Sequence, residues 1–183
     1  SYSTVLITFN SLLISHYLFE KKIKEIVKIK LKKNKVFDQK ILKIPVLYSE
    51  EFGLDLDRIS NHTGLNISEI IKLHTSKEYI VYSMGFTPGF PYLADLDKKL
   101  DMPRLKKPRL KVPQGSVAIT GAQTGIYPFE SGGGWNIIGR TPLELFDSSL
   151  EPPSRLKPGD KVKFFQIASI DEFDQISKIE KNK

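Results

Sequence analysis

The sequence predicts a mainly β protein, either a barrel or a sandwich, that follows a smaller segment mixing strand and helix. The first observation is that residues 85–139 hold nine of the twelve glycines and six of the eleven prolines, which separate short β-branched and aromatic runs. The second is that few helical patterns interrupt these runs, and the strand–helix–strand rhythm of a parallel sheet is absent. Many short strands separated by turn residues are typical of barrels and sandwiches.

The first 44 residues differ in character from the rest. Residues 3–9 (STVLITF) predict a strand, residues 19–35 predict a lysine-rich helix, and residues 40–48 (KILKIPVLY) predict a second strand. Apolar residues recur in the helix near the i, i+3, i+4 spacing, which predicts one buried face with the lysines opposite it. These apolar residues are Phe19, Ile23, Ile26, Val27 and Leu31. Because one helix and two strands cannot enclose a core, we expect that a preceding strand and helix are missing here.

The net charge of +7 comes from this same segment, which holds ten lysines, no arginine and three acidic residues. Aromatic residues are not interleaved with the lysines, so a solvated helix face explains the charge better than a nucleic-acid partner does. The chain has no cysteine and its three histidines are scattered, so we expect no disulfide and no metal site. No apolar run is long enough to span a membrane. We therefore expect a cytoplasmic protein with no membrane partner.

Beyond residue 44, each predicted element has a local signal. A short helix ends at Gly64, since glycine suits the left-handed position after a helix. Asn66 followed by Glu69 is a capping-box pattern, which begins a helix that places His74 near its C-terminal end. β-branched and aromatic runs predict five strands, and the charged end of the chain predicts a short helix. The predicted strands cover residues 78–86, 115–120, 135–140, 143–147 and 161–167.

A stiff segment, PRLKKPRLKVPQGS (103–116), is the first candidate for part of a binding site. Proline recurs in it every five residues, which predicts an extended segment outside the central sheet. The odd spacing of Arg104 and Arg109 sends their side chains to opposite faces. One could reach a cavity or a partner while the other fixes the loop. Two solvated arginines on a long loop are the alternative.

Three further turns place aromatic and polar side chains near flexible backbone. GFTPGFPYL (85–93) predicts a rigid turn that presents Phe90, either as a plug at the mouth of a barrel or as part of a pocket. A mostly apolar pocket with a few polar groups is the usual form of a small-molecule site. GAQTGIYP and GGGWNIIGR supply Gln123, Tyr127, Trp135, Asn136 and Arg140. No spacing indicates a Ser–His–Asp triad, paired carboxylates or a phosphate-binding loop.

Three stretches together closely resemble one protein family. They are LHTSKEYIVYSMGFTPGFPYLADL, MPRLKKPRLKVPQGSVAITGAQTGIYP and GGGWNIIGRTPLELFD. The family is that of the 5-oxoprolinase B subunit (PxpB), which includes the KipI-type inhibitors of sporulation kinases and many members labelled allophanate hydrolase subunit 1. The resemblance implies a ferredoxin-like α+β domain over residues 1–44, without its first strand and helix. It implies a cyclophilin-like β-barrel over residues 45–183.

The resemblance also implies a function and a set of partners. The chain would pair with the homologous C subunit of 5-oxoprolinase and, with the A subunit, open 5-oxo-L-proline to L-glutamate using ATP bound mainly by another subunit. The chain would be inactive alone and would hold no metal. Arg104, Arg109 and Arg140 would contact anions, and His74 would carry a proton. Phe90 and Trp135 would form walls, with Gln123, Tyr127 and Asn136 as polar groups of the pocket.

Two other functions are alternatives to this one. A KipI-type inhibitor would instead bind the dimerisation domain of a sporulation histidine kinase, and the sequence barely separates this alternative from the enzyme subunit. A fragment of a biotin-dependent carboxyltransferase is disfavoured, because the chain has no context for a biotinyl-lysine.

Overall fold

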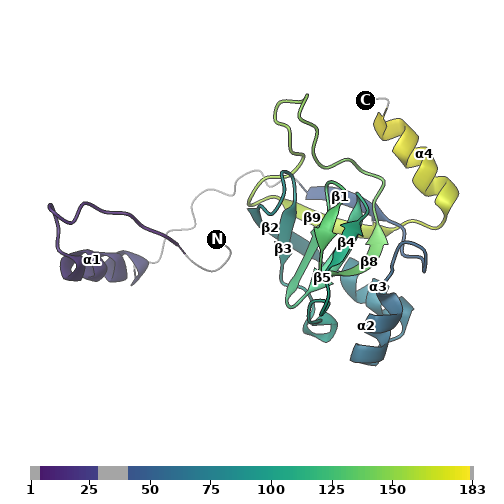
Figure 1. Ribbon diagram of the computed structural model, residues 1–183, viewed down its shortest axis with the longest axis horizontal. Helices are drawn as coiled ribbons and strands as arrows, with labels where there is room; N and C mark the ends of the chain where they lie inside the picture. Colours follow the sequence, from purple (N-terminus) through teal and green to yellow (C-terminus); the bar gives the residue numbers. More distant parts are fainter. Residues whose placement is uncertain (1–4, 29–40, 182–183) are drawn as a thin grey trace. The chain divides into compact units, whose positions relative to one another are not determined.

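The computed structural model describes residues 5–28 and 41–181. The chain falls into two compact units, which we call unit 1 (Ser1–Gln39) and unit 2 (Lys40–Lys183). The described part of unit 1 contains helix α1 (His16–Lys28). Unit 2 contains the sheet and the remaining helices (Figure 1). Its elements are β1 (Ile41–Val46), α2 (Leu56–Thr63), α3 (Ile67–Thr75), β2 (Glu78–Met84), β3 (Pro91–Ala94), η1 (Lys98–Leu100), β4 (Arg109–Val112), β5 (Ser116–Thr120), β6 (Gln123–Ile126), β7 (Ser131–Gly133), β8 (Asn136–Arg140), β9 (Lys161–Gln166) and α4 (Ile170–Lys181).

Seven strands of unit 2 form one barrel-like sheet in the order β1-β9-β2-β3-β6-β5-β8. β1 runs parallel to β9, and the other neighbouring strands pair antiparallel. The two ends of the sheet meet where Leu47 and Arg140 exchange main-chain hydrogen bonds of 2.9 and 3.1 Å. This contact, which we call the barrel seam, nearly closes the sheet and confirms the predicted mainly β, barrel-like fold.

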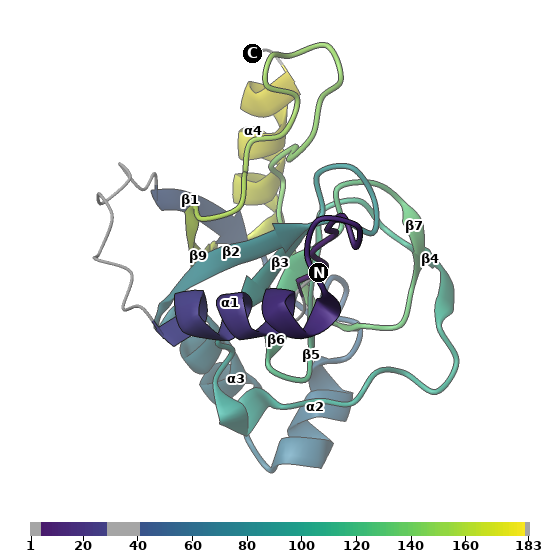
Figure 2. The ribbon, with the colours of Figure 1, turned by 90° about the vertical axis from the view of Figure 1, so that its left-hand side faces the viewer.

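The core lies inside this sheet because the strands alternate in burial. In β2, Tyr79 and Val81 are buried whereas Ile80 and Tyr82 are exposed, which is the period of two that a strand imposes. α2 and α3 lie at one end of the sheet and α4 lies at the opposite end (Figures 1 and 2). A separate two-stranded ribbon pairs β4 with β7. Up to residue 115, the stiff 103–116 segment therefore lies outside the main sheet, as its prolines predict.

Both predicted helix signals in unit 2 are confirmed. Gly64 follows α2 with φ of 74°, in the left-handed region that glycine adopts without strain. Asn66 and Glu69 form a capping box, with each side chain 2.9 Å from the other residue's main-chain nitrogen. Four of the five predicted strands occur within two residues of their predicted bounds.

The segment over residues 143–147 is not a strand. It makes a single bridge, between Phe146 and Ser154. Pro152 and Pro153 on the opposing segment have no main-chain N–H to donate, so a continuous ladder cannot form there.

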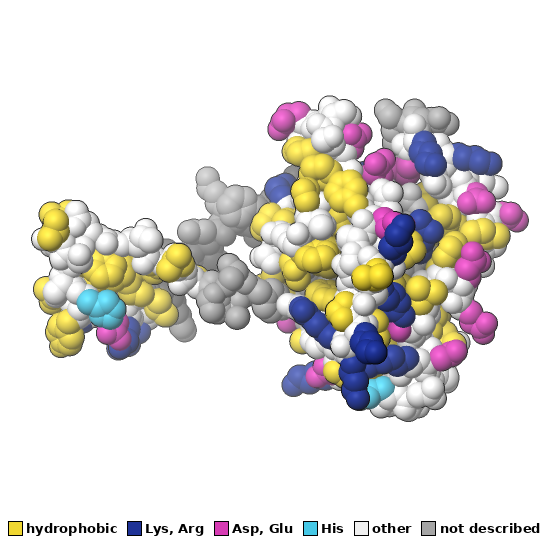
Figure 3. Space-filling view, viewed as in Figure 1, with side chains coloured by type: hydrophobic (Ala, Val, Ile, Leu, Met, Phe, Trp, Pro, Cys, Tyr) yellow, Lys and Arg dark blue, Asp and Glu magenta, His cyan; other side chains and the backbone are white. Residues whose placement is uncertain are grey.

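The first 48 residues differ from their prediction in two ways. Residues 5–9 form no strand, and strand 40–48 appears as β1, which pairs with β9 in the barrel rather than with an N-terminal strand. In the described part of the chain, no residue of α1 is buried, so the predicted buried face is absent there. Hydrophobic side chains are visible on the surface of unit 1 (Figure 3). The predicted continuation of the helix over 29–35 lies outside the described residues. The ferredoxin-like assignment of residues 1–44 stays a prediction.

Candidate functional site

A small cavity lies among the turn before β3, the loop before β4, the residue after β6 and the β7–β8 connection. Its volume is about 110 Å³. We call it the aromatic pocket, and it is lined by Phe86, Phe90, Tyr92, Arg104, Tyr127, Gly133, Gly134 and Trp135. Most ligand pockets measure about 300–1,000 Å³. The aromatic pocket therefore suits a small ring or one end of a larger molecule.

Edge-to-face ring contacts build the floor of the aromatic pocket. Phe90 packs against Tyr127 at 5.2 Å and against Trp135 at 5.5 Å between ring centroids, in both cases nearly perpendicular. All three side chains are buried. Phe86 at the rim is 62% exposed and has a φ of 67°, an unusual conformation for a bulky residue. Such strain tends to collect at binding sites.

Two glycines leave the space that these rings occupy. A Cβ on Gly133 would lie 2.2 Å from the Tyr127 hydroxyl oxygen, and a Cβ on Gly125 would lie 2.9 Å from the Phe90 ring. Both distances are too short for a side chain to be accepted without displacing the ring. Gly125 and Gly133 therefore serve close packing around the pocket.

Arg104 supplies the positive charge of the aromatic pocket. Among the described residues, no carboxylate forms an ion pair with it. Burial raises the pKa of Tyr127, and the main-chain N–H of Trp135 and the positive charges of Arg104 and Arg109 partly offset this effect. Tyr127 thus keeps its proton at neutral pH and can donate it in a hydrogen bond. A guanidinium, a phenol O–H and ring faces together can hold a planar carboxylate attached to a small ring.

Arg109 has a different task, because it forms a two-pronged ion pair with Asp55. The two hydrogen bonds measure 3.0 and 2.8 Å. Asp55 also accepts a 2.7 Å hydrogen bond from the main chain of Ile137, and its carboxylate is only 5% exposed. The pair joins the start of α2, the β4–β7 ribbon and β8. Arg104 and Arg109 therefore differ as their spacing predicts, with Arg109 holding the loop that carries Arg104.

The structure does not place Asn136 as a polar group of the pocket. Its side chain is fully buried and hydrogen-bonded: its amide nitrogen donates to the carbonyls of Pro103 and Ile119 at 3.1 Å each, and its oxygen accepts from Arg58. Because Pro103 precedes Arg104 directly, Asn136 fixes the backbone beside the pocket. Asn136 therefore does not line the aromatic pocket, and its predicted contact with a ligand stays a prediction.

His74 is not placed to carry a proton at the pocket. It is fully buried, and burial lowers its pKa from the ordinary 6.5 to about 3, so the ring is neutral near pH 7. Thr124 donates its hydroxyl proton to the Ala118 carbonyl, so it accepts from Nε2–H of His74 at 2.9 Å. Nδ1 of His74 then accepts the hydroxyl of Tyr48 at 2.7 Å. This chain of hydrogen bonds ties α3 to the sheet, which is a structural task.

The remaining two predicted residues lie elsewhere. Gln123 is at the hairpin between β5 and β6 and does not line the aromatic pocket. Arg140 is at the barrel seam and lines a second cavity beside α4. The pocket thus brings together Phe90, Arg104, Tyr127 and Trp135 but not the three arginines. Across residues 5–28 and 41–181, no three His, Cys, Asp or Glu residues are grouped to hold a metal ion.

Sequence reasoning missed Asp55 and Arg58. Asp55 is separated by 54 residues from Arg109 and by 82 residues from Ile137. Arg58 is 78 residues from Asn136. No local spacing connects such partners. The one signal that could have drawn attention to Asp55 is that it is an acidic residue at the start of a helix.

Comparison with protein-family models decides the family. Residues 1–156 match the carboxyltransferase domain, subdomain C and D. The chain belongs to this carboxyltransferase-domain family.

No helix in the described ranges has the length and apolar character needed to cross a membrane.

Curated relatives of this carboxyltransferase-family chain confirm the resemblance to the B subunit of 5-oxoprolinase. The chain is 46% identical to the 5-oxoprolinase B subunit of Bacillus subtilis over 134 residues, which are 73% of this chain and 56% of the relative. It is 47% identical to that of Escherichia coli O157:H7 over 127 residues, which are 69% of this chain and 58% of the relative. The chain thus spans a little over half the length of these relatives.

Solved structures agree with the fold. A conserved uncharacterized protein of Pyrococcus horikoshii superposes with a TM-score of 0.70 at 44% identity, over 90% of this chain and 74% of that one. The urea amidolyase of Kluyveromyces lactis superposes with a TM-score of 0.72 at 23% identity, over 95% of this chain and 12% of that one. The second likeness shows the fold alone.

Proposed function

We propose that this chain acts as the B subunit of a multi-subunit 5-oxoprolinase, which opens 5-oxo-L-proline to L-glutamate with ATP. Support comes from the identity of 46–47% with relatives that bear this name, over most of the chain. The name of these relatives implies further subunits, and we propose the A and C subunits of 5-oxoprolinase as the partners. ATP would be bound mainly by another subunit.

The aromatic pocket is the observation that carries the proposal. 5-Oxoproline is a five-membered lactam with a carboxylate on its ring, and the pocket offers a guanidinium beside ring faces in a volume of about 110 Å³. Arg104 would hold the carboxylate in a two-pronged contact. Phe90 and Trp135 would contact the ring, and the Tyr127 hydroxyl would donate to an oxygen of the ligand.

The proposed contribution of this chain is orientation and charge stabilisation. A lactam is a poor electrophile, so ATP would activate its carbonyl before water attacks. A carboxylate fixed by Arg104 would limit the rotation of the activated ring, and such positioning is a large part of enzymatic rate enhancement. Donors aimed at the developing negative charge would lower the barrier further. Asp55, Arg109 and Asn136 would act through the loop that they hold rather than by touching the ligand.

Reconstitution of the complex tests the proposal. The chain would be co-expressed with the A and C subunits of its own organism, and formation of L-glutamate from 5-oxoproline and ATP would be measured with and without it. We expect product only when all three are present. Undiminished turnover by the A and C subunits alone, or no turnover by an assembled three-subunit complex, would refute the assignment.

A further inference from the structure

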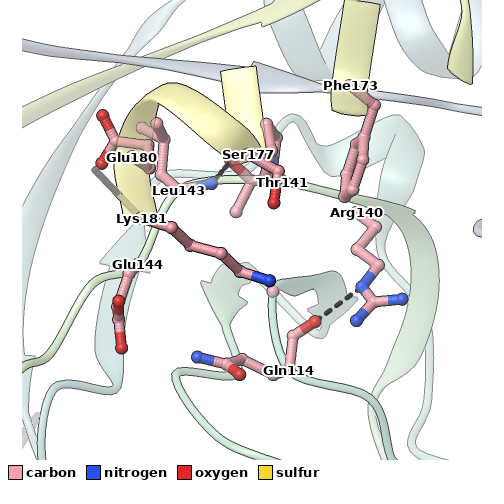
Figure 4. A pocket seen from close by; sticks show the side chains of 11 residues that line it. Gln114, Arg140, Thr141, Leu143, Glu144, Phe173, Ser177, Glu180 and Lys181 are labelled. Atoms are coloured by element: carbon pink, nitrogen blue, oxygen red, sulfur yellow. Dashed lines mark hydrogen bonds between the residues drawn. The ribbon is translucent and has the colours of Figure 1, made fainter. Parts of the chain in front are cut away.

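A second cavity, separate from the aromatic pocket, lies between α4 and the segment that follows β8. Its volume is about 210 Å³. We call it the α4 groove. Figure 4 shows the Lys181 side chain extended into it from α4, with Arg140 on one side and Glu144 on the other. One wall is firmly built, because Phe173 of α4 packs against Leu47 and Ile167.

Arg140 is held so that its terminal amino groups remain available. Its Nε donates a 2.7 Å hydrogen bond to the carbonyl of Gln114, and its guanidinium lies 5.7 Å from the centre of the Phe52 ring. Arg109 and Arg155 both pair with carboxylates, whereas Arg140 forms no ion pair with any described residue. A guanidinium fixed along one edge and stacked on a ring is preorganised to bind a planar anion with its remaining N–H groups.

Lys181 adds a second cation to the same cavity. No ion pair of Lys181 occurs within the described ranges. Two positive side chains that line one small cavity repel each other, and an anion between them removes that repulsion. Glu180 also lines the groove, and its carboxylate forms an ion pair with Arg155.

Glu144 adds a negative charge to the α4 groove. It lines the side away from Arg140 (Figure 4), and no described residue forms an ion pair with it. Besides Glu180, which pairs with Arg155, the groove therefore offers two cations at one end and the Glu144 carboxylate at the other, within a volume that suits a molecule of amino-acid size. This is the charge pattern that complements a zwitterion.

We propose that the α4 groove binds a small α-amino acid, whose carboxylate contacts Arg140 and Lys181 and whose ammonium group contacts Glu144. The groove lies at the barrel seam and shares no lining residue with the aromatic pocket. This binding activity does not depend on the proposed 5-oxoprolinase function. Its test needs no other subunit, so its failure would leave that function untouched.

Calorimetric titration of the whole chain tests the proposal, with L-glutamate, glutarate and inorganic phosphate as probes. Glutarate retains two carboxylates but lacks the ammonium group, so we expect L-glutamate to bind about tenfold more tightly. Glu144→Gln should remove this preference without weakening glutarate binding, because the lost carboxylate repels the dianion. Equal affinities for glutarate and L-glutamate, or tighter binding of phosphate than of either, would overturn the assignment to an amino acid.

Variants of the two cations locate the bound probe. Arg140→Lys keeps the positive charge but loses the two-pronged contact that a guanidinium makes with a carboxylate. Lys181→Gln removes an exposed positive charge. Each should weaken L-glutamate binding about tenfold or more. Lys178→Gln, an exposed lysine of α4 that does not line the groove, should change nothing. Unchanged binding in Lys181→Gln, or loss of binding in Arg104→Gln instead, would place the ligand elsewhere and refute the proposal.

Discussion

Replacing Asp55 by Asn tests whether the buried ion pair holds the loop that carries Arg104. The carboxylate is 5% exposed and accepts hydrogen bonds from both Arg109 terminal nitrogens and from the Ile137 main chain. Removing one partner of a buried pair costs about 3–5 kcal/mol. Because Arg109 is 27% exposed, the lower end applies, about 3 kcal/mol. In a domain of this size that lowers the melting temperature by about 10 °C.

Thermal and denaturant unfolding of the variant measure this loss directly. Asp57→Asn is the matched control, since Asp57 lies two residues further on, in the first turn of α2, and is exposed. A double variant with Arg109→Gln should lose less stability than the two single variants together, because they remove one shared interaction. If Asp55→Asn proves no less stable than Asp57→Asn, the ion pair does not anchor the ribbon and the reasoning about Arg109 is wrong.

Two further predictions concern the packing around the pocket and the buried histidine. Gly133→Ala would place a methyl group 2.2 Å from the Tyr127 hydroxyl, whereas Gly134→Ala meets its nearest atom at 3.6 Å. We expect only the first to shift the fluorescence of Trp135 and lower stability, and equal spectra would contradict the packing described. Since the pKa of His74 falls from 6.5 to about 3 on folding, the unfolded state gains a proton that the folded state excludes as the pH drops below 6.5. Above pH 6.5 the buried neutral ring therefore does not lower the free energy of unfolding. Between pH 6.5 and about pH 3, the free energy of unfolding falls by about 1.4 kcal/mol for each pH unit of acidification. The free energies of unfolding at pH 7.5 and pH 5 should differ less in His74→Gln than in the parent chain. His62→Gln, at an exposed position, should behave as the parent. Identical differences between the two pH values in all three proteins would refute this account of His74.

Sequence reasoning predicted the fold because its signals are local. Gly64 ends a helix and Asn66 with Glu69 begins the next through contacts within a few residues, so both could be read directly. The odd spacing of Arg104 and Arg109 likewise indicated two different tasks, and the two side chains do have different contacts. The same locality explains the failure at residues 143–147, where a strand-like composition faces prolines that cannot complete a ladder.

The candidate site was predicted only in part because its remaining contacts are long-range. The sequence places His74 near the C-terminal end of a helix, but it does not show that Thr124 and Tyr48 hydrogen-bond to its ring. Nor does it show that Arg140 closes the barrel with Leu47 and so faces a different cavity from Arg104. Burial and partner choice at these positions depend on the assembled sheet.

The most direct test of the central claim is the steady-state kinetics of the reconstituted complex with Arg104→Gln beside Lys106→Gln. Both residues are exposed on the same loop, but only Arg104 lines the aromatic pocket. Loss of a charge-assisted contact to the substrate carboxylate predicts that kcat/KM for 5-oxoproline falls about tenfold to a hundredfold in Arg104→Gln. Lys106→Gln should remain within about twofold of the parent complex. Equal kcat/KM values for the two variants would contradict the claim that this pocket binds the substrate.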